Sequence, residues 1–174
     1  MRYRLQPVFV LAVTACFGDL KFDENLPTSP GAPPPGSTTS LGSTSAVVDN
    51  ESFNAPLQTP AIWRNDSFGF TGINASGVTK ILTVSLRLPG PGTYHTGGTY
   101  SPVISYIEQQ GSNTYRWFMN FQRGSGSVTV SFLSNESASG YFNGELVPDS
   151  ATAAAGFVGN KFVSGGTFNV SVIR

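Results

Sequence analysis

From Ala46 onward, runs of alternating apolar and polar side chains are short and are separated by Gly, Pro, Asn and Asp. Successive side chains of a β-strand point to opposite faces, so this two-residue period is typical of strands with one buried face. Turn-forming residues at such close spacing leave little room for long helices. The pattern predicts an all-β domain over residues 46–174, built as an antiparallel β-sandwich of the jelly-roll or Ig-like kind.

The composition agrees with an all-β domain that has no covalent cross-link. Of the 174 residues, 20 are glycine and 12% are aromatic, whereas only 11% are charged. The formal net charge is zero, so no basic field is present to attract nucleic acid. Cys16 is the single cysteine, and a disulfide within the chain is therefore impossible. The domain must rely on a hydrophobic core, for which the chain is long enough.

The clearest predicted strand covers residues 78–88, and a hairpin is predicted from residues 100–108 and 113–122. In the first strand Leu82, Val84, Leu86 and Leu88 alternate with polar neighbours. Residues 150–155 could form one turn of helix. The same alternation assigns a further set of apolar side chains to the core: Tyr115, Trp117, Met119, Phe121, Val128, Val130, Phe132, Phe142, Leu146, Phe168, Val170 and Val172.

Residues 1–15 have the features of a secretory signal peptide. Arg2 and Arg4 give a positive start, residues 5–15 are mainly apolar, and small residues precede Cys16. The apolar run is about half of the ~20 residues that a transmembrane helix needs. This segment is therefore expected to direct export and not to remain as a membrane span.

Val13, Thr14, Ala15 and Cys16 resemble the lipobox of bacterial lipoproteins. The resemblance implies cleavage before Cys16, a diacylglycerol on its sulfur and further acylation, with palmitate-type chains, of its amino group. Each buried methylene adds ~0.8 kcal/mol of membrane affinity, so two or more chains would anchor the protein firmly. Phe17, in place of aspartate, favours the outer membrane by the same resemblance, on its periplasmic or its surface face. The alternative is an ordinary signal peptide followed by a chance cysteine.

Residues 16–45 form the predicted tether between the anchor and the domain. They are rich in Pro, Gly, Ser and Thr and have few apolar side chains to offset the entropy cost of ordering. The three prolines at 33–35 favour stiff polyproline II, and the Gly/Ser part favours flexible chain. A disordered spacer is the expected structure.

Five short motifs of turn and core residues lie along the domain: residues 48–50 with 53–55, 92–94, 126–130, 140–144 and 166–170. In this order and spacing, they are similar to those of small β-sandwich lipoproteins of unknown function, common in Bacteroidetes and neighbouring phyla. Asn50 stands where such domains often have glycine, and asparagine tolerates the same left-handed turn. The resemblance implies a β-sandwich and a lipid anchor, and it implies no catalytic residue.

His95, Glu136 and Glu145 are the residues that catalysis could use. A hydrolase would need His95 beside an oriented nucleophile and a third group, and no Gly-x-Ser-x-Gly motif is present. The two glutamates could be a glycosidase pair only if they face each other across a cleft. Solvated loop and strand-end residues are the simpler interpretation, and we expect no catalytic residue.

Metal and cofactor sites are not expected either. The chain lacks the several His or Cys ligands of a transition-metal site. Asp49, Glu51 and Asp66 lie near turns and could converge on Ca²⁺, but no spaced calcium-binding loop is present.

Exposed aromatics give the better functional lead. Tyr94, Tyr100, Tyr106, Phe118 and Tyr141 fall outside the predicted core pattern, and Tyr94, Tyr100 and Phe118 are the candidate ligand contacts. Aromatic rings on a sheet can stack on sugars or anchor a protein partner. The expected function is that of a non-enzymatic envelope lipoprotein with a binding or structural role, whose partner is a glycan or an envelope protein. A carbohydrate-binding module and, less favoured, a hydrolase are the alternatives.

Overall fold

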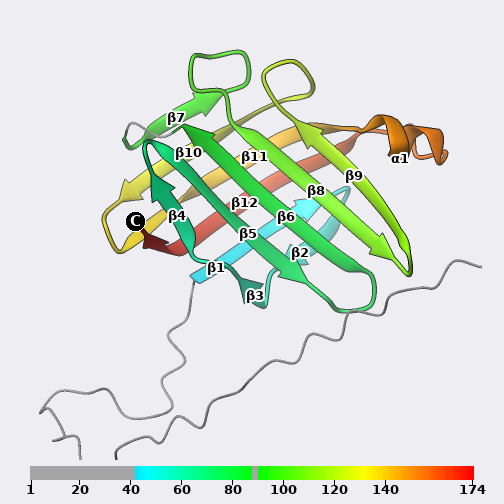
Figure 1. Ribbon diagram of the computed structural model, residues 1–174, viewed down its shortest axis with the longest axis horizontal. Coiled ribbons are helices and arrows are strands. Elements are labelled where there is room, and N and C mark those ends of the chain that lie inside the picture. Colours follow the sequence, from blue (N-terminus) through cyan, green and yellow to red (C-terminus); the bar gives the residue numbers. More distant parts are fainter. Residues whose placement is uncertain (1–41, 88–89) are drawn as a thin grey trace, which may run out of the picture. The chain divides into compact units, whose positions relative to one another are not determined.

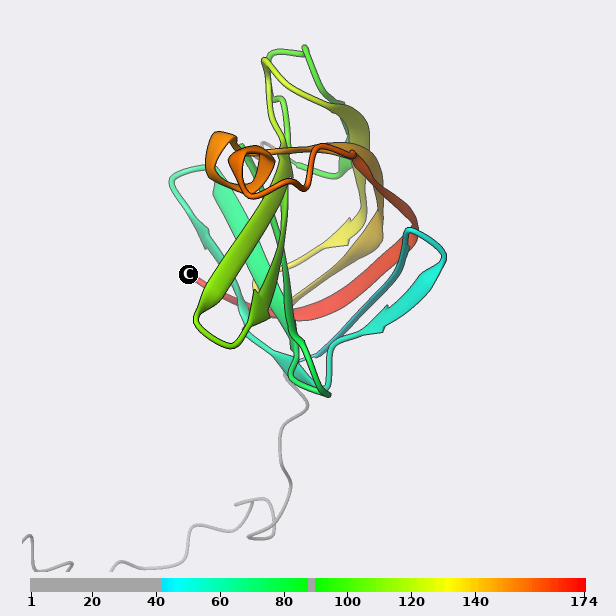
Figure 2. The same ribbon diagram turned by 90° about the vertical axis from the view of Figure 1, so that its right-hand side faces the viewer.

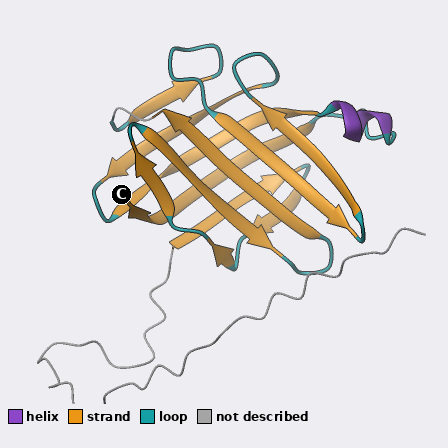
Figure 3. Cartoon of the chain, viewed as in Figure 1, coloured by secondary structure: helices purple, strands orange, loops and turns teal. Residues whose placement is uncertain are grey.

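The computed structural model describes residues 42–87 and 90–174, so the predicted signal peptide, Cys16 and most of the predicted tether lie outside the described residues (Figure 1). Strands dominate this part, and the five-residue α1 is its only helix (Figure 3). The all-β prediction is confirmed. The elements in chain order are β1 (Gly42–Val48), β2 (Glu51–Asn54), β3 (Leu57–Gln58), β4 (Ala61–Arg64), β5 (Ser67–Asn74), β6 (Thr79–Arg87), β7 (Gly92–His95), β8 (Val103–Gln110), β9 (Asn113–Met119), β10 (Ser125–Leu133), β11 (Ser137–Pro148), α1 (Ser150–Ala154) and β12 (Lys161–Ile173).

The strands form two packed layers. Layer A has the order β2-β1-β12-β11-β10-β7, and layer B has the order β4-β5-β6-β8-β9, with β3 also paired to β5. Figure 1 shows layer B in front and the strands of layer A crossing obliquely behind it, and Figure 2 shows the two layers from the end near α1. This arrangement is the predicted sandwich.

Two long strands connect the layers at their corners. The last residues of β12, Val172 and Ile173, pair with β4 of layer B in the only parallel pairing among the described strands. The end of β11, at Val147 and Pro148, pairs with β9 of layer B. The ladder therefore runs from one layer into the other at both corners.

The core lies between the layers and is rich in phenylalanine. Phe70 of layer B packs against Phe168 of layer A, with ring centroids 4.8 Å apart. Leu88 lies outside the described residues. Most of the predicted core side chains are indeed buried: Leu82, Val84, Leu86, Trp117, Met119, Val128, Val130, Phe142, Leu146, Phe168, Val170 and Val172.

The core prediction was wrong for Phe121 and Phe132, which are 66% and 53% exposed. β9 ends at Met119, where the chain turns. Asn120 Oδ1 accepts hydrogen bonds from the backbone N–H groups of Gln122 and Arg123, and this turn places Phe121 in a loop. A register shift between Val130 and Phe132 turns the Phe132 side chain to the outer face. Tyr115, also assigned to the core, is half-buried and packs on Phe157.

The domain begins earlier than residue 46. β1 starts at Gly42, which pairs with Val170 of β12, so residues 42–45 belong to the sheet and not to the tether. The Thr44 side chain is buried, and the Ser45 hydroxyl hydrogen-bonds to that of Thr167 at 2.9 Å. Small hydroxyl side chains occur in tethers and in strands alike, so composition alone placed this boundary too late.

Candidate functional site

The outer face of layer A presents three exposed aromatic side chains, which we call the aromatic face: Phe132, Tyr141 and Phe162. They are 53%, 57% and 59% exposed and come from the adjacent strands β10, β11 and β12. Directly paired residues share one face of a sheet, and the register pairs Phe132 with Ser139, two residues before Tyr141, and Phe162 with Glu145, four residues after it. All three rings therefore stand on the same side of the sheet.

The three aromatics form a diagonal line. Strands lie ~4.8 Å apart and each residue advances a strand by ~3.3 Å, so the Cα atoms of Phe132 and Tyr141 are about 8 Å apart. The same spacing separates Tyr141 from Phe162 by about 14 Å. A line of rings on one face is the arrangement that favours an elongated ligand over a single small molecule.

The surroundings of Tyr141 are polar but uncharged. One cross-strand row contains, in order, Thr93, Thr129, Tyr141, Thr167 and Ser45. Its outer members are joined in hydroxyl pairs, Thr93 to Thr129 at 3.0 Å and Ser45 to Thr167 at 2.9 Å. Such a row presents hydroxyl groups in fixed positions beside an exposed ring.

Two of the three predicted ligand contacts meet at the edge of layer A. Tyr94 and Tyr100 pack edge to face with ring centroids 6.4 Å apart, and with Thr93 and His95 they line a shallow pocket of about 330 Å³. The Tyr94 hydroxyl donates a hydrogen bond to the Gly90 carbonyl, which fixes the ring. Thr93 belongs both to this tyrosine pocket and to the row that contains Tyr141, whereas Tyr94 pairs with the buried Val128 and packs against the core, so the pocket lies around the edge of the sheet from the aromatic face.

Phe118 and Tyr106 lie elsewhere. Phe118 stands on the outer face of layer B, half-buried beneath the Arg123 guanidinium, so it does not join the tyrosines. Tyr106 is 1% exposed and packs on Phe53 and Trp117, which contradicts its assignment to the surface. Burial and the neighbouring Glu108 carboxylate raise the pKa of Tyr106.

The calcium interpretation of Asp49, Glu51 and Asp66 is wrong in this structure. Asp49 Oδ2 lies 3.3 Å from Lys161 Nζ, and Glu51 Oε2 lies 2.5 Å from Lys80 Nζ. Each of these carboxylates therefore forms an ion pair with a lysine. The hydrogen-bonded Lys80 ammonium lowers the pKa of Glu51. Asp66 is in the turn between β4 and β5, and no cluster of three metal-binding side chains occurs in residues 42–87 and 90–174.

Lys161 is the centre of the acidic end of the sandwich. Its Nζ is also 3.1 Å from Glu108 Oε1 and lies 4.6 Å from the centre of the Trp117 ring. Two carboxylates and an aromatic ring therefore stabilise the partly buried Lys161 ammonium, and we interpret the cluster as structural.

The residues considered for catalysis are not assembled. His95 is exposed at the end of β7, and its imidazole has no hydrogen bond to a serine or a carboxylate in the described part of the chain. Glu136 precedes β11 and Glu145 lies near its far end, so about 30 Å of extended strand separates them. A glycosidase pair needs at most ~10 Å between its carboxyl groups, and this excludes the pairing.

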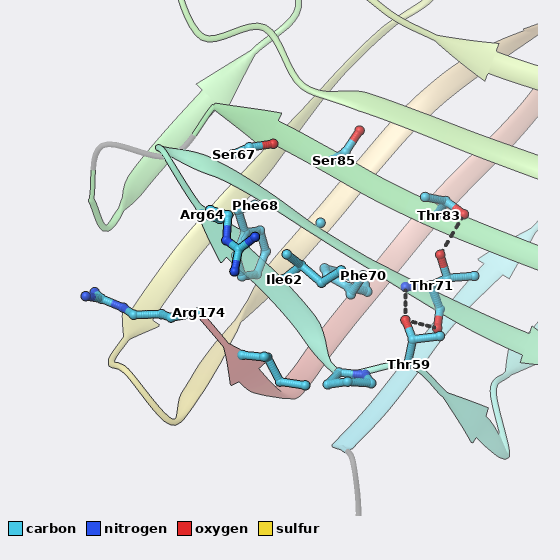
Figure 4. Close-up of a pocket in the computed structure, with 13 residues that line it drawn as sticks. Thr59, Ile62, Arg64, Ser67, Phe68, Phe70, Thr71, Thr83, Ser85 and Arg174 are labelled. Carbon is cyan, nitrogen blue, oxygen red and sulfur yellow. Dashed lines mark hydrogen bonds between the residues drawn. The ribbon is translucent and has the colours of Figure 1, made fainter.

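A larger depression lies on the outer face of layer B, and we call it the arginine groove. It has a volume of about 740 Å³, and its lining includes Ile62, Ile173, Gly69 and Ser67, with Arg64 and Arg174. Figure 4 shows Arg64 and Ser67 at one end, the threonines Thr59, Thr71 and Thr83 at the other, and Ile62 between them. Sequence reasoning did not find this groove.

Comparisons with protein-family models, with curated proteins and with solved structures found no match to this chain. The resemblance to small β-sandwich lipoproteins therefore stays a prediction. Among the described residues, no helix has the length and apolar character needed to cross a bilayer.

Proposed function

We propose that this chain is a non-enzymatic lipoprotein of a bacterial envelope, whose sandwich binds a neutral glycan on the aromatic face. The observation that carries the proposal is the diagonal line of Phe132, Tyr141 and Phe162 on one face of layer A. Sugar rings have apolar faces that stack on exposed aromatics, and a line of rings gives an elongated polymer several contacts.

The surrounding chemistry supports an uncharged ligand. Thr93, Thr129 and Thr167 supply hydroxyl groups that can donate to or accept from sugar hydroxyls, and no cation lies in their cross-strand row. Thr93, on the edge strand β7, is shared by this row and the tyrosine pocket, whose Tyr94 ring lies on the core-facing side of the sheet. A structural role without a ligand is the alternative. It would leave the apolar surface of three large aromatic rings exposed to water with no partner to cover it.

The lipid anchor is the second part of the proposal and rests on the lipobox resemblance of residues 13–16. A tether that leaves the sandwich free to turn would allow the aromatic face to meet a polymer near the membrane. Export, anchoring at Cys16 and glycan binding together describe a protein that holds envelope or extracellular polysaccharide at a membrane surface.

A glycan array tests the binding site. The full chain with Cys16→Ser would be applied to neutral and acidic glycans, and dissociation constants would be measured for any that bind. Tyr141→Ala and Phe162→Ala should each weaken binding about tenfold, because losing one stacked ring costs ~1.4 kcal/mol. Phe121→Ala is the matched control, because Phe121 is at least as exposed as Tyr141 and Phe162 but lies in a loop outside the aromatic face. Absence of binding to every glycan, or an equal loss with Phe121→Ala, would refute the site.

A further inference from the structure

We propose that the arginine groove binds a single-chain anionic lipid of the fatty-acid class, with its carboxylate between Arg64 and Arg87 and its acyl chain over Gly69. This site lies on layer B and is independent of the glycan-binding proposal.

The head-group site is a cross-strand row of two arginines around a serine; Arg64 and Ser67 line the end of the groove, and Arg87 stands next to Ser67 just outside its lining. Ser67 of β5 pairs with Arg64 of β4 on one side and with Arg87 of β6 on the other. All three side chains are exposed, and neither arginine forms an ion pair within residues 42–87 and 90–174. Asp66, in the adjacent turn, is not paired with either of them. Guanidinium groups match a carboxylate in geometry and charge, and the Ser67 hydroxyl can donate a third hydrogen bond.

The acyl-chain site is the next outward-facing row of the same sheet. It runs from Ile173 through Ile62 and Gly69 to Ser85, all in the lining of the groove, and Val103 continues the row beyond it. Ile62, Ile173 and Val103 are 61%, 53% and 37% exposed, so their apolar surface is uncovered. Gly69 leaves this part of the floor without a side chain, and a Cβ there would stand 3.3 Å from the Val84 carbonyl oxygen.

The groove suits an acyl chain better than a peptide strand. An extended peptide binds a sheet through a free strand edge, but β4 is hydrogen-bonded to β5 on one side and to β12 on the other. Thr71 and Thr83 bond to each other at 3.0 Å, so their hydroxyls do not require a polar ligand. A volume of about 740 Å³ is within the range of pockets that bind small amphiphiles.

Fluorescent fatty-acid binding tests the proposal. The full chain would carry Cys16→Ser, so that no acyl chain of its own could enter the groove, and it would be titrated with cis-parinaric acid. We expect saturable binding that dodecanoate displaces and that dodecyltrimethylammonium, which has the same tail and a cationic head, does not. The double variant Arg64→Gln/Arg87→Gln and the variant Ile62→Ser should each weaken binding about tenfold, and added salt should weaken it further.

Two matched variants control for general surface effects. Arg116→Gln removes an arginine from the same layer outside the groove, and Phe121→Ser removes an apolar side chain that is 66% exposed in the loop after β9, outside both proposed sites. Both should bind like the parent chain, and circular dichroism should confirm that every variant is folded. Equal displacement by the cationic amphiphile, no saturable binding, or full binding by the groove variants would overturn the proposal.

Discussion

At the scale of single residues, Asp149 connects the helix to the sheet. It is the N-cap of α1, and its Oδ1 accepts a hydrogen bond from Thr152 N at 2.7 Å. Thr152 is buried, and its hydroxyl in turn accepts from Arg116 N of β9 at 2.7 Å. The hydrogen bond from the Thr152 backbone is the main reason that the pKa of Asp149 is lowered. The carboxylate therefore fixes a short helix on a strand.

The cap gives a pH-dependent prediction. The pKa of Asp149 is lower in the folded chain than its unfolded value of ~3.9. The stabilisation that the carboxylate gives to the folded state is therefore complete above the unfolded pKa and is lost as the pH falls through the folded pKa. Asp149→Ala should lower the free energy of unfolding by about 1 kcal/mol at pH 7 and by less near pH 3, as measured by urea unfolding. Asp149→Asn keeps an acceptor and should remove the pH dependence at a cost of about 0.5 kcal/mol or less. Equal stability of Asp149→Ala and the parent at pH 7 would contradict this role.

Individual residues also show where sequence reasoning succeeds and fails. Tyr141 was identified as a surface aromatic because its buried neighbours Gly140 and Phe142 alternate with it regularly. Phe132 was misassigned because a register shift in β10 breaks the two-residue period, and local alternation gives no sign of the shift. Tyr106 was misassigned because apolar residues occur on both faces of β8. Of the aromatic face, the sequence reasoning therefore missed Phe132 and also Phe162, which it did not assign to any face.

At the scale of elements, the hairpin of β1 and β2 depends on two residues with left-handed backbones. Asp49 has φ 49° and Asn50 has φ 67°, the geometry of a type I′ turn. Asp49 is held by Lys161 and by the backbone N–H of Phe162 at 2.8 Å, so it cannot be exchanged freely. Asn50 tolerates the conformation, but glycine adopts it without a steric cost.

Asn50→Gly should therefore stabilise the chain. We expect the free energy of unfolding to rise by about 0.5–1 kcal/mol, because glycine is preferred at the second position of this turn. Asn50→Ala should lower it by about 1 kcal/mol, because alanine strains a backbone with positive φ. Thermal and urea unfolding of both variants measure these changes, and a stabilising alanine would show that the turn is not under this constraint.

The elements themselves were more predictable than their arrangement. Alternation located the strands around β6, β8, β9, β10 and β11, since each has one face in the core. It underestimated β12, whose glycines at 165 and 166 interrupt the apolar pattern without ending the strand. The corner pairings of β11 and β12 join segments that are far apart in the chain, and neither local pattern nor composition contains that information.

At the scale of the whole domain, the two outer faces have different chemistry. Layer A presents hydroxyls, amides and the aromatic face, whereas layer B presents Arg64, Arg87 and exposed isoleucines. The groove was not predicted, since it arises from residues of β4, β5, β6 and β12 that meet only in the folded chain. If both proposals hold, the two dissimilar faces of one sandwich would bind two dissimilar ligands.

The proposed anchor determines where both faces would act. If Cys16 carries acyl chains, the mature protein should sediment with membranes, resist extraction by high salt and be released by detergent. Cys16→Ser leaves no sulfur for the lipid, so the variant should move to the soluble fraction with an otherwise intact sandwich. Phe17→Ser is the matched control and should stay in the membrane fraction, because it changes the neighbouring residue but leaves the thiol. Metabolic labelling with palmitate should mark the parent and Phe17→Ser but not Cys16→Ser. A Cys16→Ser protein that still sediments with membranes would refute lipid anchoring, and glycan or fatty-acid binding would then have to be explained for a protein held by some other contact.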